Sequence, residues 1–205
     1  MTSKTWIRFF FSTLLLGGVS TIIIGLCLRW NTYEIIFLNF QIKEFVIVSL
    51  WLLGVGFIFS VVSQMGFFAY LTLHRFGLHM FRSIWLWNGF QVVVIVFVLC
   101  DFVYLRSLVL LNNSAAFLSN VFLALFLLVS ALVIAIVKSK ETNRQAFIPA
   151  LFFMIVATIV EWVPALRVND RDWMYMMLVP LLVCNAYQLL MLHRIIQKEK
   201  VMYKG

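Results

Sequence analysis

The sequence predicts an all-α membrane protein, a polytopic bundle of six transmembrane helices with both termini in the cytoplasm. Hydrophobic residues make up 64% of the 205 residues and charged residues only 12%, whereas soluble proteins are about 45–50% apolar and about 25% charged. Six apolar stretches are each about as long as the ~20 residues that a helix needs to cross the hydrocarbon core. The sixteen Lys and Arg residues are divided unequally between alternate connections.

The predicted spans follow one another with short connections, at about residues 9–28, 45–73, 84–105, 115–137, 146–164 and 173–192. None of them alternates apolar and polar residues at a period of two, which favours helices over the strands of a barrel. The second stretch is long enough that it must tilt or extend beyond the hydrocarbon. The connections are too short to hold a soluble domain with its own core, so we predict one integral membrane domain over residues 1–205.

The basic residues predict the orientation of this domain. Eleven lie in the N-terminus, the second and fourth connections and the C-terminus, and five lie on the other side. Short segments rich in Lys and Arg stay in the cytoplasm, so we expect a multi-pass protein of the cell membrane with both termini cytoplasmic. The same distribution accounts for the net charge of +8, which therefore does not indicate nucleic-acid binding.

The first span carries small residues at four-residue spacing, namely Gly17, Thr21 and Gly25. Such a face lets two helices approach closely, and it either closes the bundle on itself or contacts a partner protein. The three cysteines are scattered singly, so a zinc site is not expected. Cys27 and Cys100 lie near the outer ends of their helices, where they either form a disulfide or remain free thiols.

Polar residues inside apolar spans are costly and mark candidate sites. Five carboxamides fall in the inner half of the second, third and sixth spans: Gln64, Asn88, Gln91, Asn185 and Gln188. They form either a hydrogen-bonded layer that fixes helix register or the contacts of a bound substrate. The acids Asp101 and Glu161 are expected within about one turn of water at the outer ends of their helices.

The densest run of functional side chains joins the second and third spans. Aromatic residues there alternate with His74, Arg75, His79 and Arg82, a composition typical of a headgroup interface and equally suited to docking another membrane protein. Gly77 is expected to provide the reversal between the two helices. The two histidines have poor spacing for a shared metal and no Cys or carboxylate nearby, so no metal site is predicted.

This run, SQMGFFAYLTLHRFGLHMFRS from residue 63, resembles the KinB-signalling pathway activation proteins of endospore-forming bacteria. The length, the six spans and the basic C-terminal tail are also similar to that family. The resemblance implies a regulator without enzymatic activity or cofactor, which acts on a membrane sensor histidine kinase in the initiation of sporulation. The chain has no phosphate-binding loop, HExxH or GxSxG motif.

Two other classes of function remain open. A substrate-binding membrane subunit of a small-molecule uptake transporter has about this length and number of helices, and the five carboxamides would then be ligand contacts. An intramembrane enzyme is less favoured, because it needs convergent acids, bases or metal ligands. We therefore predict no catalytic residue.

Overall fold

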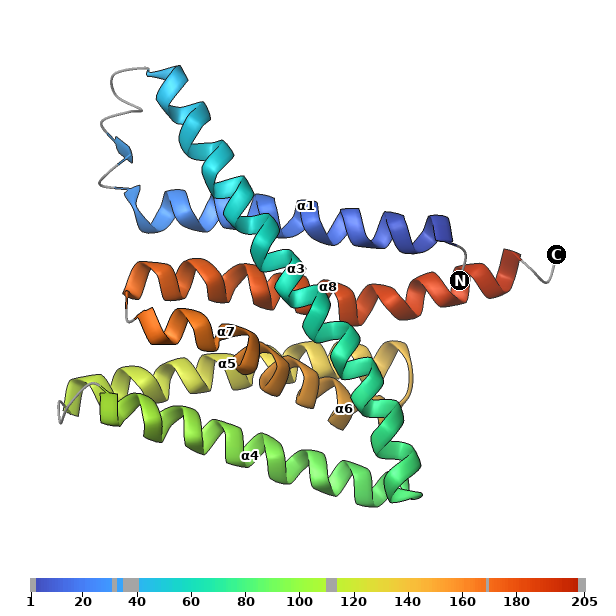
Figure 1. Ribbon diagram of the computed structural model, residues 1–205. Coiled ribbons are helices and arrows are strands. Elements are labelled where there is room, and N and C mark those ends of the chain that lie inside the picture. The colour runs from blue at the N-terminus through green and yellow to red at the C-terminus, as the bar shows by residue number, and fades with distance from the viewer. Residues whose placement is uncertain (1–2, 31–32, 35–40, 110–113, 169, 203–205) are drawn as a thin grey trace. The chain divides into compact units, whose positions relative to one another are not determined.

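The computed structural model describes residues 3–30, 33–34, 41–109, 114–168 and 170–202. These residues fold into long helices joined by short connections (Figure 1). The helical segments are α1 (Ser3–Leu28), α3 (Ile42–Phe81), α4 (Ile84–Val109), α5 (Ser114–Glu141), the 3₁₀ turn η1 (Arg144–Ala146), α6 (Phe147–Phe152), the π-helical turn η2 (Phe153–Ala157), α7 (Thr158–Val168) and α8 (Arg171–Met202).

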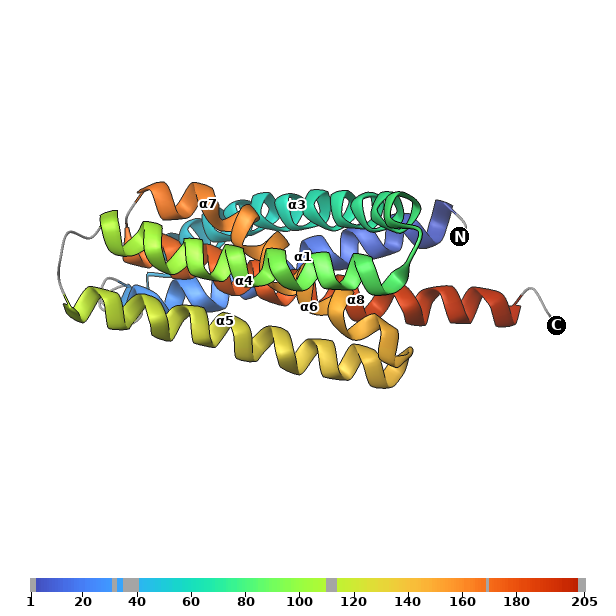
Figure 2. The ribbon, with the colours of Figure 1, turned by 90° about the horizontal axis from the view of Figure 1, so that it is seen from below.

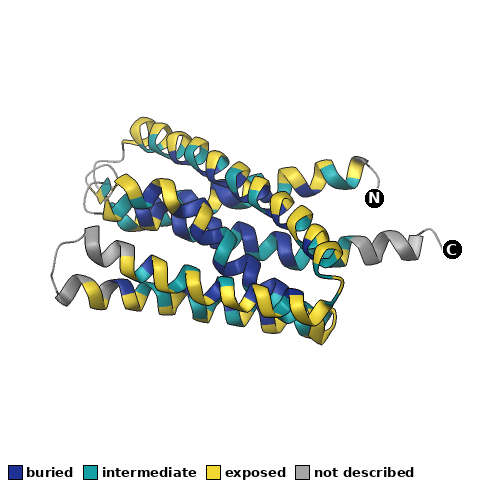
Figure 3. Cartoon of the chain, turned by 60° about the horizontal axis from the view of Figure 1, so that its bottom comes forward, coloured by how far each residue is buried: buried dark blue, intermediate teal, exposed yellow. Residues whose placement is uncertain are grey.

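Six of these helical stretches are long and apolar enough to cross a membrane, which confirms the predicted all-α class and the expected number of long apolar helices. The fifth stretch joins η1, α6, η2 and α7 without a break and runs over Arg144–Val168. Many large apolar side chains on the six stretches are exposed, such as Phe97 and Phe122, while buried and exposed residues alternate along each helix (Figure 3). Exposed apolar surface of this extent is unusual in a soluble protein and is what a lipid-facing bundle needs.

The described residues form two compact units, and the boundary between them falls within α3 and α7. The first unit contains residues 1–66 and 161–205, and the second contains residues 67–160.

In the first unit, α1 runs along α8, and α3 crosses α1 (Figure 1). The crossing depends on Gly56, because a Cβ atom built there would lie 2.7 Å from the Cα atom of Gly18 and 2.8 Å from the carbonyl oxygen of Gly17. A larger residue at position 56 would push the two backbones apart. On the other side of α1, the Tyr187 hydroxyl donates to Ser12 Oγ over 2.9 Å.

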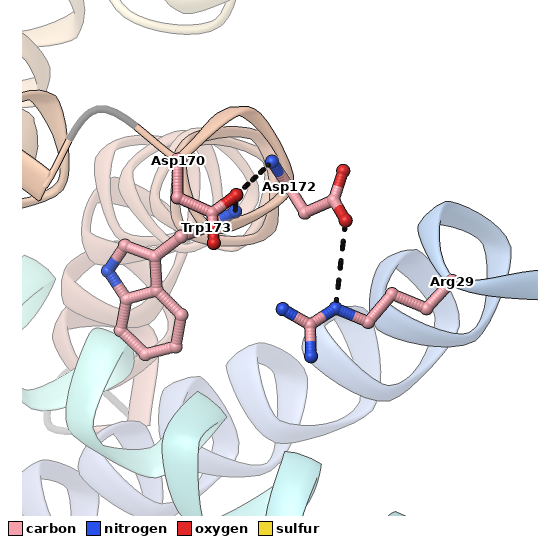
Figure 4. A network of polar contacts seen from close by, with 4 residues as sticks. All are labelled: Arg29, Asp170, Asp172 and Trp173. Carbon is pink, nitrogen blue, oxygen red and sulfur yellow. Dashed lines mark hydrogen bonds and ion pairs between the residues drawn. The ribbon is translucent and has the colours of Figure 1, made fainter. Parts of the chain in front are cut away.

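An ion pair joins the C-terminal end of α1 to the N-terminal end of α8 (Figure 4). Arg29 Nε lies 3.7 Å from Asp172 Oδ2, and both side chains are partly exposed. Asp170 precedes α8 and accepts the backbone N–H of Asp172 over 2.9 Å, so it caps the helix at the place where its first amides lack partners. Exposed pairs of this kind contribute at most about 1 kcal/mol.

In the second unit, α4 and α5 lie side by side and pack against α6 (Figures 1 and 2). Aromatic side chains fill its core: the rings of Phe67 and Phe153 are 5.4 Å apart and both are fully buried. The Tyr70 hydroxyl donates to the carbonyl of Pro149 over 3.0 Å. Phe153 begins η2, a single π-helical turn that contacts α4 and α5, and such turns insert one extra residue into a helix.

The reversal between α3 and α4 is not at Gly77, so that prediction is wrong. Gly77 lies inside α3, which continues to Phe81, and the chain turns at Arg82, whose φ of 51° is in the left-handed region. Gly77 is needed for another reason: a Cβ atom there would overlap the buried ring of Trp87. The glycine lets the first turn of α4 pack tightly on α3.

Candidate functional site

A chain of buried side-chain hydrogen bonds links α3, α7 and α8 within the first unit. Gln188 Nε2 donates to Ser63 Oγ over 2.7 Å. Ser63 Oγ donates to Asn185 Oδ1 over 2.6 Å, and Asn185 Nδ2 donates to Glu161 Oε2 over 2.8 Å. Ser63, Asn185 and Gln188 are fully buried, and Glu161 is 7% exposed. We call these four residues the Glu161 network.

The position of Glu161 contradicts the sequence-based expectation that it lies next to water. The predicted fifth span ends at Pro164, but α7 continues through this proline to Val168. The additional residues place Glu161 seven positions, or about 10 Å, from the end of the helix. A proline removes one backbone hydrogen bond but does not have to end a helix within a bundle.

Gly66 closes the network on the α3 side. A Cβ atom built on Gly66 would overlap Glu161 Oε1 and lie 2.8 Å from the carboxyl carbon. The backbone of α3 therefore packs directly on the carboxyl group, and a side chain larger than hydrogen at this position would displace that group.

A second, smaller set of polar contacts joins α1 to α3 and α8, next to the Glu161 network in sequence. Cys184 Sγ donates to the carbonyl oxygen of Thr13 over 3.7 Å and lies 3.6 Å from Ser60 Oγ. Ser60 Oγ also donates to the Thr13 carbonyl, over 3.3 Å. All three residues are buried. Cys184 is thus a buried free thiol, while Cys27 and Cys100 are free and exposed.

The small-residue face of α1 is occupied by the protein's own helices. Gly17 packs against Ser60 and Cys184, and Gly25 packs against Leu52. Thr21 is fully buried and donates to the carbonyl of Gly17 over 2.8 Å. In this structure the face is therefore covered by packing within the protein. This arrangement corresponds to the first of the two alternatives, in which the face packs within the bundle and not against a partner protein.

The five predicted carboxamides are divided between the two units. Asn185 and Gln188 meet through Ser63, as described above, and Gln64 Nε2 donates to the carbonyl of Phe10 over 3.4 Å. Asn88 and Gln91 belong to the second unit. The side-chain oxygen of Asn88 and both polar side-chain atoms of Gln91 are buried without a hydrogen bond among the described residues. The layer of five therefore stays a prediction.

The C-terminal segment of α3 and the turn after it contain one side chain that bonds to α4 and several that are exposed. His74 Nδ1 accepts a hydrogen bond from Trp87 Nε1 over 3.0 Å, which ties α3 to α4. Arg75, His79 and Arg82 are exposed. No group of three or more potential metal-ligating side chains occurs in the part of the chain that the structure describes.

Sequence reasoning missed Ser63 and Glu161 as members of the network, and it missed Gly66 as the residue that packs on the Glu161 carboxyl group. An acidic residue in an apolar span is by itself a signal of a functional site, and it was available for Glu161. The predicted end of the fifth span at Pro164 hides this signal, because it puts Glu161 within about one turn of water. Ser63 gave no such signal, since serines in these helices commonly bond to their own backbone, as Ser12 and Ser20 do.

Comparison with known proteins identifies the family. The sequence model described as KbaA, KinB-signalling pathway activation in sporulation, matches residues 17–195. A relative from Bacillus subtilis (strain 168), named KinB-signaling pathway activation protein, is 46% identical over 198 residues, which are 97% of this chain and 100% of the relative. No solved structure matches the chain. With a family match over most of its length and a relative that aligns from end to end, the chain belongs to the KbaA family of KinB-signalling pathway activation in sporulation.

Proposed function

We propose that this protein is a non-enzymatic membrane regulator that activates sporulation signalling through the KinB sensor kinase pathway. The observation that carries the proposal is the 46% identity over the full length of the Bacillus subtilis relative named for that activity.

The protein acts from within the cell membrane as a single six-span domain with both termini in the cytoplasm. Two observations support this part of the proposal. Six helices are long and apolar enough to span, and the basic residues divide eleven to five between the alternate sides, with the richer side expected in the cytoplasm.

The partner is a membrane-embedded sensor histidine kinase, and the contact involves the C-terminal end of α3 and the turn after it. His74, Arg75, His79 and Arg82 fall in this segment, and the last three are exposed. Large apolar side chains stand beside them, with Phe76 74% and Trp85 88% exposed. Aromatic and Arg side chains are enriched at the centres of protein interfaces. The small-residue face of α1, formed by Gly17, Thr21 and Gly25, contributes to the kinase contact only indirectly, because it packs α1 against α3.

The regulator shifts the kinase between two conformations rather than carrying out a reaction. A partner changes such an equilibrium only by binding one conformation better than the other. A tenfold change in active kinase needs about 1.4 kcal/mol of differential binding, which a few exposed aromatic and Arg contacts supply.

The proposal is tested by complementation of a Bacillus subtilis strain that lacks the relative. Expression of this chain is expected to restore spore yield and phosphorelay output. An inserted and abundant protein that restores neither would show that the function is different.

The contact segment is tested in the same strain with charge reversals. Arg75→Glu is expected to reduce relay output, whereas Arg144→Glu is expected to leave it unchanged. Arg144 is also exposed and also lies on the side predicted to be cytoplasmic, so it controls for charge and topology. Equal output from both variants would remove the α3 end from the contact.

One groove in the second unit does not support the transporter alternative. An apolar groove of about 480 Å³ lies between α4 and α5, and it is lined by side chains such as Leu99, Tyr104 and Leu125. None of the five carboxamides lines this groove, whereas a substrate site needs a few convergent polar groups.

A further inference from the structure

Glu161 is the one charged residue that is buried within the part of the chain that the structure describes. Its two carboxyl oxygens have different surroundings. Oε2 accepts a hydrogen bond from Asn185 Nδ2 over 2.8 Å. Oε1 is buried and has no hydrogen-bond partner among the described residues. An oxygen in this position is an acceptor that only a proton, a cation or a donor group can satisfy.

No charged side chain neutralises Glu161 among the residues that the structure describes. In the first unit, α3 presents Ser63 and Gly66 to the carboxyl group, and α8 presents Asn185. The thiol of Cys184, also on α8, is the titratable group near enough for Glu161 to act on it electrostatically, and it carries no positive charge. Among the described residues, Glu161 makes no ion pair. A carboxylate buried in a membrane bundle without a positive partner is costly and is rarely found without a function.

The space beside Oε1 decides which species can bind there. The Cα atom of Gly66 packs so closely on this oxygen that even an added Cβ would overlap it. A metal ion needs several oxygen ligands arranged around it, and no cluster of metal-ligating side chains occurs among the described residues. A proton needs no additional room, since it becomes part of the carboxyl group.

We infer that the Glu161 network is an intramembrane proton-binding site, at which the carboxyl group of Glu161 takes up and releases one proton. Protonation converts the carboxylate to a neutral carboxylic acid: one O–H bond forms on the carboxyl group, and one O–H bond of a hydronium ion breaks to leave a water molecule. This inference goes beyond the proposed function and is independent of any kinase.

The hydrogen bonds of the network give the proton a way to act on helix packing. Ser63 has one hydroxyl hydrogen and gives it to Asn185 Oδ1, so the amide of Asn185 must turn its N–H₂ group toward Glu161. A hydrogen bond to a charged acceptor is about twice as strong as one to a neutral acceptor. Loss of the negative charge therefore loosens the link between α7 and α8. The protein therefore has two states, one with a strong and one with a weak link between α7 and α8, and protonation of Glu161 favours the second.

Infrared difference spectroscopy of the purified full-length protein in lipid nanodiscs tests the inference. Spectra recorded over a pH series are expected to contain the C=O band of a protonated, buried carboxyl group that shifts in D₂O. Glu161→Gln should lose this band, and Asp101→Asn should keep it, because Asp101 is an exposed acid on α4. A band that is unchanged in Glu161→Gln at every pH overturns the proton site.

Two further arms keep the test decisive. If Glu161→Gln does not insert, Asn185→Ala replaces it, since loss of the Nδ2 donor should shift both the frequency of the band and the pH at which it appears. Identical bands in Asn185→Ala and the unmodified protein overturn the inference. Replacement of choline chloride by sodium chloride at constant pH should leave the band unchanged, and its loss would assign the site to a metal cation instead.

Discussion

Gly66 and Gly54 lie on the same helix and have opposite surroundings. A Cβ atom on Gly66 would overlap the Glu161 carboxyl group, whereas one on Gly54 would meet no atom within 4 Å. Gly66→Ala is expected to lower the free energy of unfolding by about 1–3 kcal/mol, as overpacking does. Gly54→Ala is expected to raise it by up to about 1 kcal/mol, because alanine favours a helix. Thermal unfolding of both variants in one detergent gives the comparison, and equal shifts would contradict the packing described here.

Two carboxamide-to-leucine changes separate bonded from unbonded amides. Asn185→Leu leaves the hydroxyl hydrogen of Ser63 and Glu161 Oε2 without their partner, and we expect the free energy of unfolding to fall by about 1–3 kcal/mol. That is more than the ~0.6 kcal/mol average for hydrogen bonds in membrane bundles. Gln91→Leu removes two buried polar atoms that have no partner among the described residues, so its cost should be near zero. Unfolding by denaturant in mixed micelles measures both, and a larger loss for Gln91→Leu would contradict the assignment.

At this scale the sequence predicted part of the candidate site. Asn185 and Gln188 stand out because carboxamides are rare in apolar spans, and both prove to be fully buried and bonded to Ser63 or Glu161. Ser63 could not be singled out, because a serine in a helix bonds equally well to its own backbone. Its role depends on which helix lies opposite, and that is a property of the tertiary fold.

Arg82 forms the turn between α3 and α4 with φ at 51°, a conformation that costs a residue with a Cβ atom about 1–2 kcal/mol. Arg82→Gly is therefore expected to raise the unfolding midpoint slightly, since the relief of strain exceeds the entropy that glycine adds to the unfolded chain. Arg82→Val should lower it, because a β-branched residue tolerates this conformation poorly. Thermal unfolding followed by circular dichroism measures both changes. A lower midpoint for Arg82→Gly would show that the side chain, not the backbone, determines stability at the turn.

The helices themselves were predictable, and their ends were not. Runs of about twenty apolar residues leave a membrane-spanning chain no other structure, because every backbone amide must be bonded internally. The apolar pattern does not determine where such a helix ends, and α3 continues to Phe81 and α7 to Val168 through polar residues and Pro164. The π-helical turn at Phe153–Ala157 also leaves no periodic signal, since all of its residues are apolar or small.

The basic residues predict the orientation of the whole molecule. Reporter fusions after Gly205 and in the Asn112–Asn113 connection, both outside the described residues, are expected to report a cytoplasmic C-terminus and an extracytoplasmic connection. The reason is the eleven-to-five division of Lys and Arg. A C-terminal fusion that reports the extracytoplasmic side would reverse the topology and remove the α3 end from the cytoplasm.

The central claim is that this chain activates signalling through KinB, and the most direct measurement is its epistasis with that kinase. Phosphorelay output is compared in Bacillus subtilis strains that lack the native relative, with and without KinB, before and after expression of this chain. The account predicts that output and spore yield rise only in the strain that contains KinB. An equal rise in both strains, or no rise in either strain with the protein inserted in the membrane, would contradict it.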